Sequence, residues 1–518
     1  MKKIFYLTFV LFAGLIFGCG KGKNDIVKSK NPMYPSKIGT TVQLIEDSVY
    51  LYAAEDYLWF NQLPSYYLFG PRTFTNPEDL KALQSELDAL SQYAINPATG
   101  APYEYSMYNP GVAKYSFIDD GTETAALNGV KGDFGFDVQY SKINDLRVEY
   151  VYAGSPAALA GMTRSDEITS INGNTNISYD APGYGSGTST NLNFVSNAIY
   201  DSGSITLNIT RVDGSTYTAN LSTANYNVNP ILKDTIYTSA KGTKVGYIVF
   251  NSFVSDEVAD PLLNAAFSNF VKAGITDLIV DLRYNGGGYV STAEHLDDLL
   301  VPSSKNNTLM FNTYYNSNLV SNKDPLLKNQ WRPGTPDINY GQFNYTVAAN
   351  VTNFAKSGSL SLSRVFFIMT GQTASASELT INNLRPEMDV EFVGEVSYGK
   401  PVGFFDIDIN KYIMYTPEFS VQNSAGQGGY YQGFAPGTDG YPGVNDADDL
   451  TRQWGDPKEA LLADAMGYIN TGTYDAVNPV RTLSKSRSEN SFSASMPKRV
   501  ILNKHKFIGM LGRKVKTR

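Results

Sequence analysis

Hydrophobic and polar positions follow three different patterns along the chain. Between about residues 38 and 108, apolar residues recur every three to four positions, most clearly over 48–64 and at Leu80, Leu83 and Leu87. This spacing is typical of amphipathic helices. The first region is therefore predicted to be helical, and its aromatic residues are expected to form its core.

Between about residues 114 and 226, short runs of alternating apolar and polar residues are separated by turn residues. Such runs predict β-strands. Residues 178–193 are rich in Gly, Ser and Thr, which predicts a loop inserted between strands.

Between about residues 235 and 470, continuous apolar runs alternate with amphipathic ones. Strands joined by helices imply crossover connections and an α/β layer. The predicted strands lie within 244–253, 275–288, 363–371 and 389–396, and the predicted helices within 258–274, 289–301 and 375–386.

The first residues read as an export signal. Lys2 and Lys3 precede a continuous apolar run, Ile4 to Phe17, which is too short to span a bilayer as a mature helix. Cys19 is the only cysteine, so it has no internal disulfide partner. Its place directly after the apolar run resembles a bacterial lipoprotein cleavage box. An ordinary signal peptide with a chance cysteine is the alternative.

Charge and composition exclude several classes of function. The net charge of −8 argues against a general nucleic-acid binder, and an apolar content of 42% is enough for several cores. No His, Cys and carboxylate cluster has the spacing of a metal site, and no cofactor is implied. A basic tail, residues 482–518, has no predicted structure, although its apolar runs, among them "KFIGML", could pair back on the fold.

The stretch "TGQTASASEL", residues 370–379, lies between a predicted strand and a predicted helix. A serine in such a turn is exposed, and helix N-terminal amides can stabilise an oxyanion. Serine also needs a base, and the chain has only two histidines: His505 in the basic tail and His295 at an ordinary helix position. Lys400 is the alternative, because burial lowers the pKa of an amine.

The middle region resembles a PDZ domain. A strand is followed by Gly154-Ser155-Pro156-Ala157, which opens a short helix, and then by "GMTRSDEITSINGN". In PDZ domains a loop before a strand binds a peptide C-terminal carboxylate through its backbone N–H groups. The resemblance places that loop at Phe134, Gly135 and Phe136, where the alternative is a glycine in a β-bulge.

Three motifs lie C-terminal to this region: "VDLRYNGGG", "TASASE" and "SYGKPVG". Their order and spacing resemble those of the carboxy-terminal processing peptidases. That family consists of serine proteases with a Ser–Lys pair. The resemblance implies Ser375 as nucleophile and Lys400 as general base. It also implies an oxyanion hole made by the backbone N–H of Ala376 and that of Gly287, with Gly286 as the alternative.

One position departs from the family pattern. Members often carry a Gln four residues after the Lys, which orients the base, and this chain has Phe404 there. A second hypothesis is therefore a peptide-binding or scaffold lipoprotein that keeps the fold without catalysis. Residues Ser397 to Lys400 also match the S-x-x-K motif of penicillin-binding proteins, but Gly399 and Pro401 argue against the helix which that motif needs.

The sequence thus predicts an α/β multidomain protein with a helical N-terminal domain, a PDZ-like β domain and a protease core. The family resemblance implies that this core consists of crotonase-like βαβ units. The expected activity is endoproteolysis of protein or peptide substrates with accessible C-termini. The expected location is the bacterial cell envelope, on the periplasmic side of the outer membrane. The expected boundaries are 1–18 (signal peptide), 19–37 (lipoprotein tether), 38–113 (helical domain), 114–230 (PDZ-like domain), 231–481 (core) and 482–518 (tail).

Overall fold

The computed structural model describes residues 35–106, 109–182, 187–333, 337–474, 502, 507–512 and 517. Residues 38–518 form one compact unit, and residues 1–37 are separate from it. The predicted export signal and the lipidation site at Cys19 lie outside the described residues. Within the described ranges, no helix is long and apolar enough to cross a membrane.

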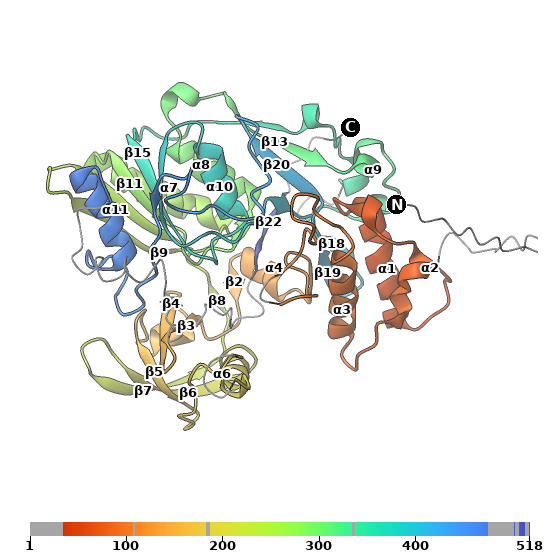
Figure 1. Ribbon diagram of the computed structural model, residues 1–518, viewed down its shortest axis with the longest axis horizontal. Coiled ribbons are helices and arrows are strands. Elements are labelled where there is room, and N and C mark those ends of the chain that lie inside the picture. Colours follow the sequence, from red (N-terminus) through yellow and green to blue (C-terminus); the bar gives the residue numbers. More distant parts are fainter. Residues whose placement is uncertain are drawn as a thin grey trace, which may run out of the picture. The chain divides into compact units, whose positions relative to one another are not determined.

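Helices α1 (Thr41–Asp56), α2 (Tyr66–Phe69) and α3 (Asp79–Ser91) form the first part of the compact unit (Figure 1). The α1 helix begins before the periodic pattern of 48–64, because a capping box starts it at Thr40. The Thr40 hydroxyl accepts the Gln43 N–H, and the Gln43 side chain accepts the Thr40 N–H.

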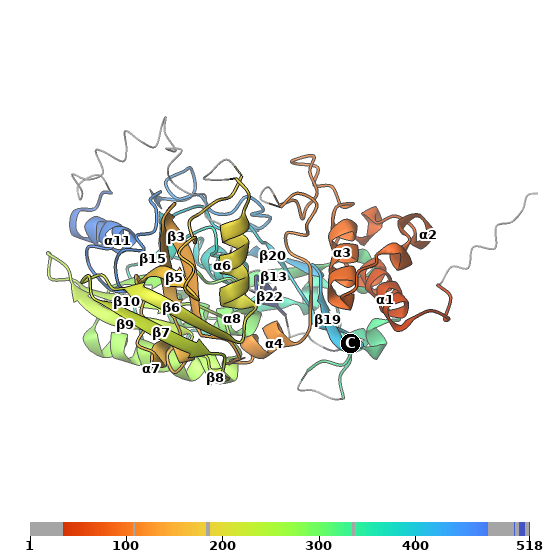
Figure 2. The same ribbon diagram turned by 90° about the horizontal axis from the view of Figure 1, so that it is seen from below.

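A five-stranded antiparallel sheet occupies the region where alternating patterns predicted strands. Helix α6 (Thr190–Tyr200) lies over this sheet (Figure 2) and packs Val195 and Ile199 into its core. It begins inside the predicted loop, because the Asp180 carboxylate accepts the N–H groups of Asn191 and Leu192. The strands, in sheet order, are β3 (Phe136–Lys142), β4 (Asp145–Val151), β5 (Glu167–Ile171), β6 (Ser204–Thr210) and β7 (Thr216–Ser222), with α5 (Pro156–Leu159) after β4.

A six-stranded sheet forms the largest layer, and its central strands β16, β15, β11 and β10 pair in parallel. The predicted crossover connections are present as helices. In sheet order the strands are β21 (Gly443–Val444), β16 (Asp389–Gly394), β15 (Arg364–Met369), β11 (Asp277–Asp281), β10 (Lys244–Phe250) and β9 (Ile231–Thr238). The helices are α7 (Asp256–Ala273), α8 (Val290–Leu300), α10 (Ala376–Leu384) and α11 (Ala460–Thr471).

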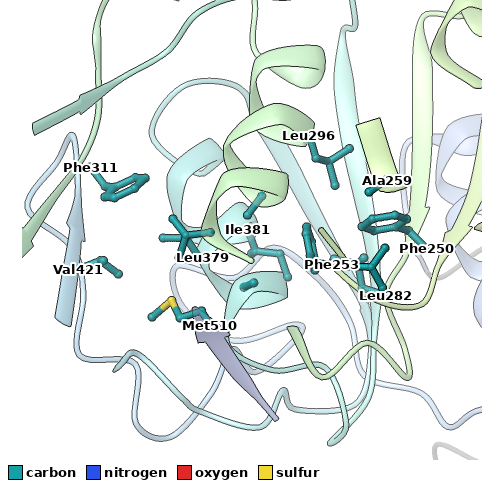
Figure 3. Close-up of a cluster of buried hydrophobic side chains, with 14 of the residues drawn as sticks. Phe250, Phe253, Ala259, Leu282, Leu296, Phe311, Leu379, Ile381, Val421 and Met510 are labelled. Atoms are coloured by element: carbon teal, nitrogen blue, oxygen red, sulfur yellow. The ribbon is translucent and has the colours of Figure 1, made fainter. Parts of the chain in front are cut away.

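Alternate residues of the six-stranded sheet face two separate apolar cores. On β15, Phe366 and Ile368 join the core that α11 covers, whereas Val365 and Phe367 join the core with α7, α8 and α10. Figure 1 shows α11 on one side of β11 and β15 and the other three helices on the opposite side. Figure 3 shows part of the second core, to which α10 contributes Leu379 and Ile381 and α8 contributes Leu296.

Smaller elements complete the unit. A four-stranded sheet runs in the order β14 (Val351–Asn353), β13 (Leu309–Tyr315), β20 (Phe419–Asn423) and β17 (Val402–Gly403). A three-stranded sheet contains β1 (Phe117–Asp119), β19 (Tyr412–Tyr415) and β18 (Ile407–Ile409). Two further sheets have two strands each: β2 (Val130–Lys131) pairs with β8 (Tyr226–Asn227), and β12 (Gly287–Tyr289) pairs with β22 (Gly509–Leu511). The short helices include α4 (Thr122–Leu127) and α9 (Ser317–Val320).

A buried ion-pair network braces the end of β11. The Arg283 guanidinium lies 2.7 Å from Asp281, 2.9 Å from Glu459 and 2.6 Å from Asp448. Arg164, from the loop before β5, also pairs with Asp448 at 2.7 Å. The network therefore fixes the start of the glycine turn and joins the five-stranded sheet to the six-stranded one.

Candidate active site

Ser375 occupies the N-cap of α10, at the turn that follows β15. Its backbone has φ 59° and ψ −105°, a conformation that non-glycine residues rarely adopt. The side chain is fully buried, and its Oγ has no hydrogen-bond partner among the described residues. A strained, buried turn thus carries the predicted nucleophile at the positive end of a helix.

The glycine turn of residues 285–288 lies against this serine turn. Ala374 N–H donates to the Asn285 carbonyl at 3.0 Å, and the Ser377 hydroxyl donates to the same oxygen at 3.0 Å. A Cβ built on Gly287 would lie only 3.0 Å from the Ala376 nitrogen, so this close approach requires glycine. The structure therefore places the glycine turn, with Gly286 and Gly287, against the turn that carries Ser375 and Ala376.

The Gly287 N–H is already engaged, because it donates to the Asn285 side-chain oxygen at 2.9 Å. Beside the turn lies a cavity of about 50 Å³, whose wall includes Gly286, Gly287 and Lys131. An oxyanion bound to the Gly287 N–H would have to replace the Asn285 side chain as acceptor.

Lys400 follows β16 in a loop, and its side chain is fully buried. Burial lowers the pKa of its amine well below the ordinary value, and the opposing charges of Glu104, Glu418 and Glu378 raise it in part. The Nζ lies 3.5 Å from the centre of the Phe404 ring and donates to the Ile508 carbonyl. Phe404 thus forms an apolar wall beside this amine.

Glu378 joins the two predicted catalytic residues. Its Oε2 accepts the Ser375 N–H at 2.9 Å and the Lys400 N–H at 2.8 Å. Its Oε1 accepts the Ser397 hydroxyl at 2.5 Å and the Gly399 N–H at 2.7 Å. Burial raises the pKa of this carboxyl, whereas these donors lower it. Spacing along one helix could not reveal these contacts, because they join α10 to a loop far along the chain.

The predicted peptide-binding loop lies at the start of β3. Phe134 and Phe136 are buried in the core of the five-stranded sheet, and Gly135 has φ 83°. A Cβ on Gly135 would lie 2.0 Å from the Ser155 Cβ, so the loop requires glycine there. The Gly135 N–H donates to the Asp133 carboxylate at 2.8 Å. A peptide carboxylate at this N–H would have to displace that side chain.

The five-stranded sheet also contacts the serine turn directly. The Gln372 amide donates to the Glu149 carboxylate of β4 at 3.1 Å. This contact provides a physical link between the predicted peptide-binding region and the nucleophile.

The sequence also offered chemical candidates other than the Ser375 and Lys400 pair. His295 on α8 contacts the Asn264 side chain at 3.0 Å, and His505 lies outside the described residues. Ser397 and Lys400 lie in a loop, so the S-x-x-K motif does not form the helical turn of the penicillin-binding proteins. The described ranges contain no group of three or more side chains that could hold a metal ion.

The sequence left open a further component of the site, the segment Phe507–Gly512. Its strand β22 pairs in parallel with β12, and Gly509 lies opposite Gly287. The apolar run in "KFIGML" was the available signal, but the partner strand could not be found from it.

Known proteins resemble this chain in sequence and fold. Residues 244–436 match the family model of Peptidase family S41. The carboxy-terminal processing protease CtpA of Bacillus subtilis (strain 168) is 24% identical over 333 residues, which are 63% of this chain and 57% of that protein. A further match is to the crystal structure of a Bacteroides fragilis NCTC 9343 protein, assigned to the S41 proteases. This match covers 85% of this chain and 98% of that protein's chain. Its identity is 22% and its TM-score 0.53, which shows a shared fold.

The match to CtpA spans less than two thirds of that relative's length. The three comparisons nevertheless agree with one another and with the motifs around Ser375 and Lys400. They confirm the resemblance to the carboxy-terminal processing peptidases.

Proposed function

We propose that this protein is a serine endopeptidase in which Ser375 is the nucleophile and Lys400 the general base. One observation carries the proposal: the backbone N–H groups of both residues donate to the same oxygen of Glu378. The two side chains therefore start from adjacent points of one rigid, buried framework. The depressed pKa of Lys400 supports the role of base, because a neutral amine can accept the serine proton.

The reaction follows from these positions. Ser375 Oγ would attack the carbonyl carbon of the scissile peptide while its proton passes to the neutral Lys400 amine. The N–H of Ala376, with that of Gly287 or Gly286, would donate to the oxyanion. The ammonium would then protonate the leaving amine, and the neutral lysine would take a proton from the water that hydrolyses the ester.

Substitution of either member of the pair should abolish proteolysis. We expect Ser375→Ala and Lys400→Ala to reduce the initial rate of casein cleavage on the order of a thousandfold or more, because the nucleophile and its base act as a unit. Lys411→Ala removes an exposed lysine and should cleave at the wild-type rate. Equal cleavage by wild type and both site variants would leave the non-catalytic, peptide-binding scaffold as the better description.

We also propose that the five-stranded domain is PDZ-like and binds the C-terminal end of a protein substrate at Phe134–Phe136. The short loop before β3, the adjacent helix α6 and the contact from Gln372 to Glu149 support this role. Fluorescence anisotropy with the Ser375→Ala protein can compare a labelled peptide as free acid and as C-terminal amide. The free acid should bind roughly tenfold more tightly, since it alone offers charge-assisted hydrogen bonds. Equal affinities would exclude carboxylate recognition.

The protein is further proposed to be exported and anchored by lipid on Cys19, at the periplasmic face of the bacterial outer membrane. The apolar run from Ile4 to Phe17 and the cysteine that follows support the proposal. Cells that express the full chain should incorporate labelled palmitate into it, and Cys19→Ser should abolish the label and release the protein from membranes. Equal labelling of the two proteins would contradict the anchor.

A further inference from the structure

The segment Phe507–Gly512, here called the tail segment, lies as a strand between the two halves of the candidate active site. On one side, the Gly509 N–H donates to the Gly286 carbonyl at 3.0 Å. On the other side, the Phe404 N–H donates to the Met510 carbonyl at 2.8 Å, and the Gly512 N–H donates to the Phe404 carbonyl at 3.2 Å. Extended peptides bind clefts by this kind of strand addition.

Apolar side chains fix the tail segment in place. Met510 is fully buried and packs in the core that contains Leu379 and Val421 (Figure 3). Phe507 and Leu511 pack in a second cluster, which contains Phe404. Gly509 has no room for a side chain, because a Cβ there would lie 2.7 Å from the Phe404 ring.

The backbone of the tail segment contacts the groups proposed to react. The Lys400 amine donates to the Ile508 carbonyl, whereas the Ser375 Oγ has no partner among the described residues. A Cβ on Gly287 would lie 2.2 Å from the Gly509 oxygen, so this carbonyl lies directly against the glycine turn. A substrate peptide cannot occupy the same space.

The contacts extend to both sides of this cleft. Leu502 is buried in the core of the five-stranded domain, and its carbonyl accepts the Ser196 hydroxyl of α6 at 2.9 Å. Gly512 forms part of the wall of a hollow of about 480 Å³, lined also by Phe311 and Phe419. Leu502 therefore contacts α6, and the tail segment, which begins five positions later, contacts the candidate active site.

We propose that the tail segment is a built-in competitor of the substrate, which holds the enzyme in a self-inhibited form until it leaves the cleft. The inference rests on the proposed function, since it concerns the same site. It also defines the ligand that fits: an extended apolar segment with glycine opposite Gly287, bound by backbone hydrogen bonds on both edges.

Removal of the segment should increase activity. A variant that ends at Ile501 should cleave casein with a kcat/KM roughly tenfold above that of the full chain. The reason is that a segment which occupies the cleft in most molecules lowers the fraction of enzyme able to bind substrate. The full-length variant Gly509→Leu should show the same increase, since the added side chain collides with Phe404. This variant keeps the test valid if the shortened chain fails to fold.

A peptide provides a readout that does not depend on catalysis. A fluorescein-labelled peptide of residues 502–514 should bind the shortened chain carrying Ser375→Ala, and the same peptide with Gly509→Leu should bind at least tenfold more weakly. Full-length Ser375→Ala should bind the peptide less well than the shortened form, because its own segment fills the cleft.

The two readouts separate the inference from the proposed function. Peptide binding without casein cleavage by any variant would support the occupied cleft and contradict the peptidase assignment. Equal cleavage by the full chain, the shortened chain and Gly509→Leu would overturn the inference while the peptidase assignment stands. Absence of peptide binding to the shortened chain would overturn it as well.

Discussion

The carboxylate of Glu378 is the interaction on which the candidate site depends. It lies in the first turn of α10 and accepts hydrogen bonds from Ser375, Ser397, Gly399 and Lys400. A buried carboxylate is costly unless donors surround it, and each buried donor is costly without an acceptor. One side chain therefore fixes the serine turn and the lysine loop in a single arrangement, although Lys400 follows Ser375 by 25 positions in the sequence.

Close backbone approach is the second constraint on the site. The glycine turn reaches the serine turn because Gly287 has no side chain, and the tail segment reaches the glycine turn because Gly509 has none. The strained backbone of Ser375 is held by the same contacts, since Ala374 and Ser377 both bond to Asn285. The serine turn, the glycine turn and the tail segment are therefore packed as one unit, and the rings of Phe404 and Tyr115 lie against the amine of Lys400.

Sequence patterns predicted the parts of this structure that depend on local periodicity. The strands β10, β11, β15 and β16 and the helices between them were predicted because continuous apolar runs and 3.6-residue spacing are local signals. The turn at Ser375 was predicted for the same reason. Sequence patterns did not predict the contact of Glu378 with the lysine loop, the aromatic wall beside Lys400 or the partner of β22. Each depends on contacts between segments far apart in the chain. Helix α6 was not predicted, because its first residues are polar and the acceptor for its N-terminal amides, Asp180, lies ten positions earlier.

The most direct test of the Ser375–Lys400 pair is the pH dependence of Ser375 modification by a fluorophosphonate probe, measured on the shortened chain as a second-order rate constant. Burial lowers the pKa of Lys400, so its amine is charged and inactive at low pH and neutral above its own pKa. The rate should therefore rise with pH through one ionisation well below the ordinary value of 10.5, and Lys400→Ala should lack that rise. An identical pH profile in wild type and Lys400→Ala would contradict the account.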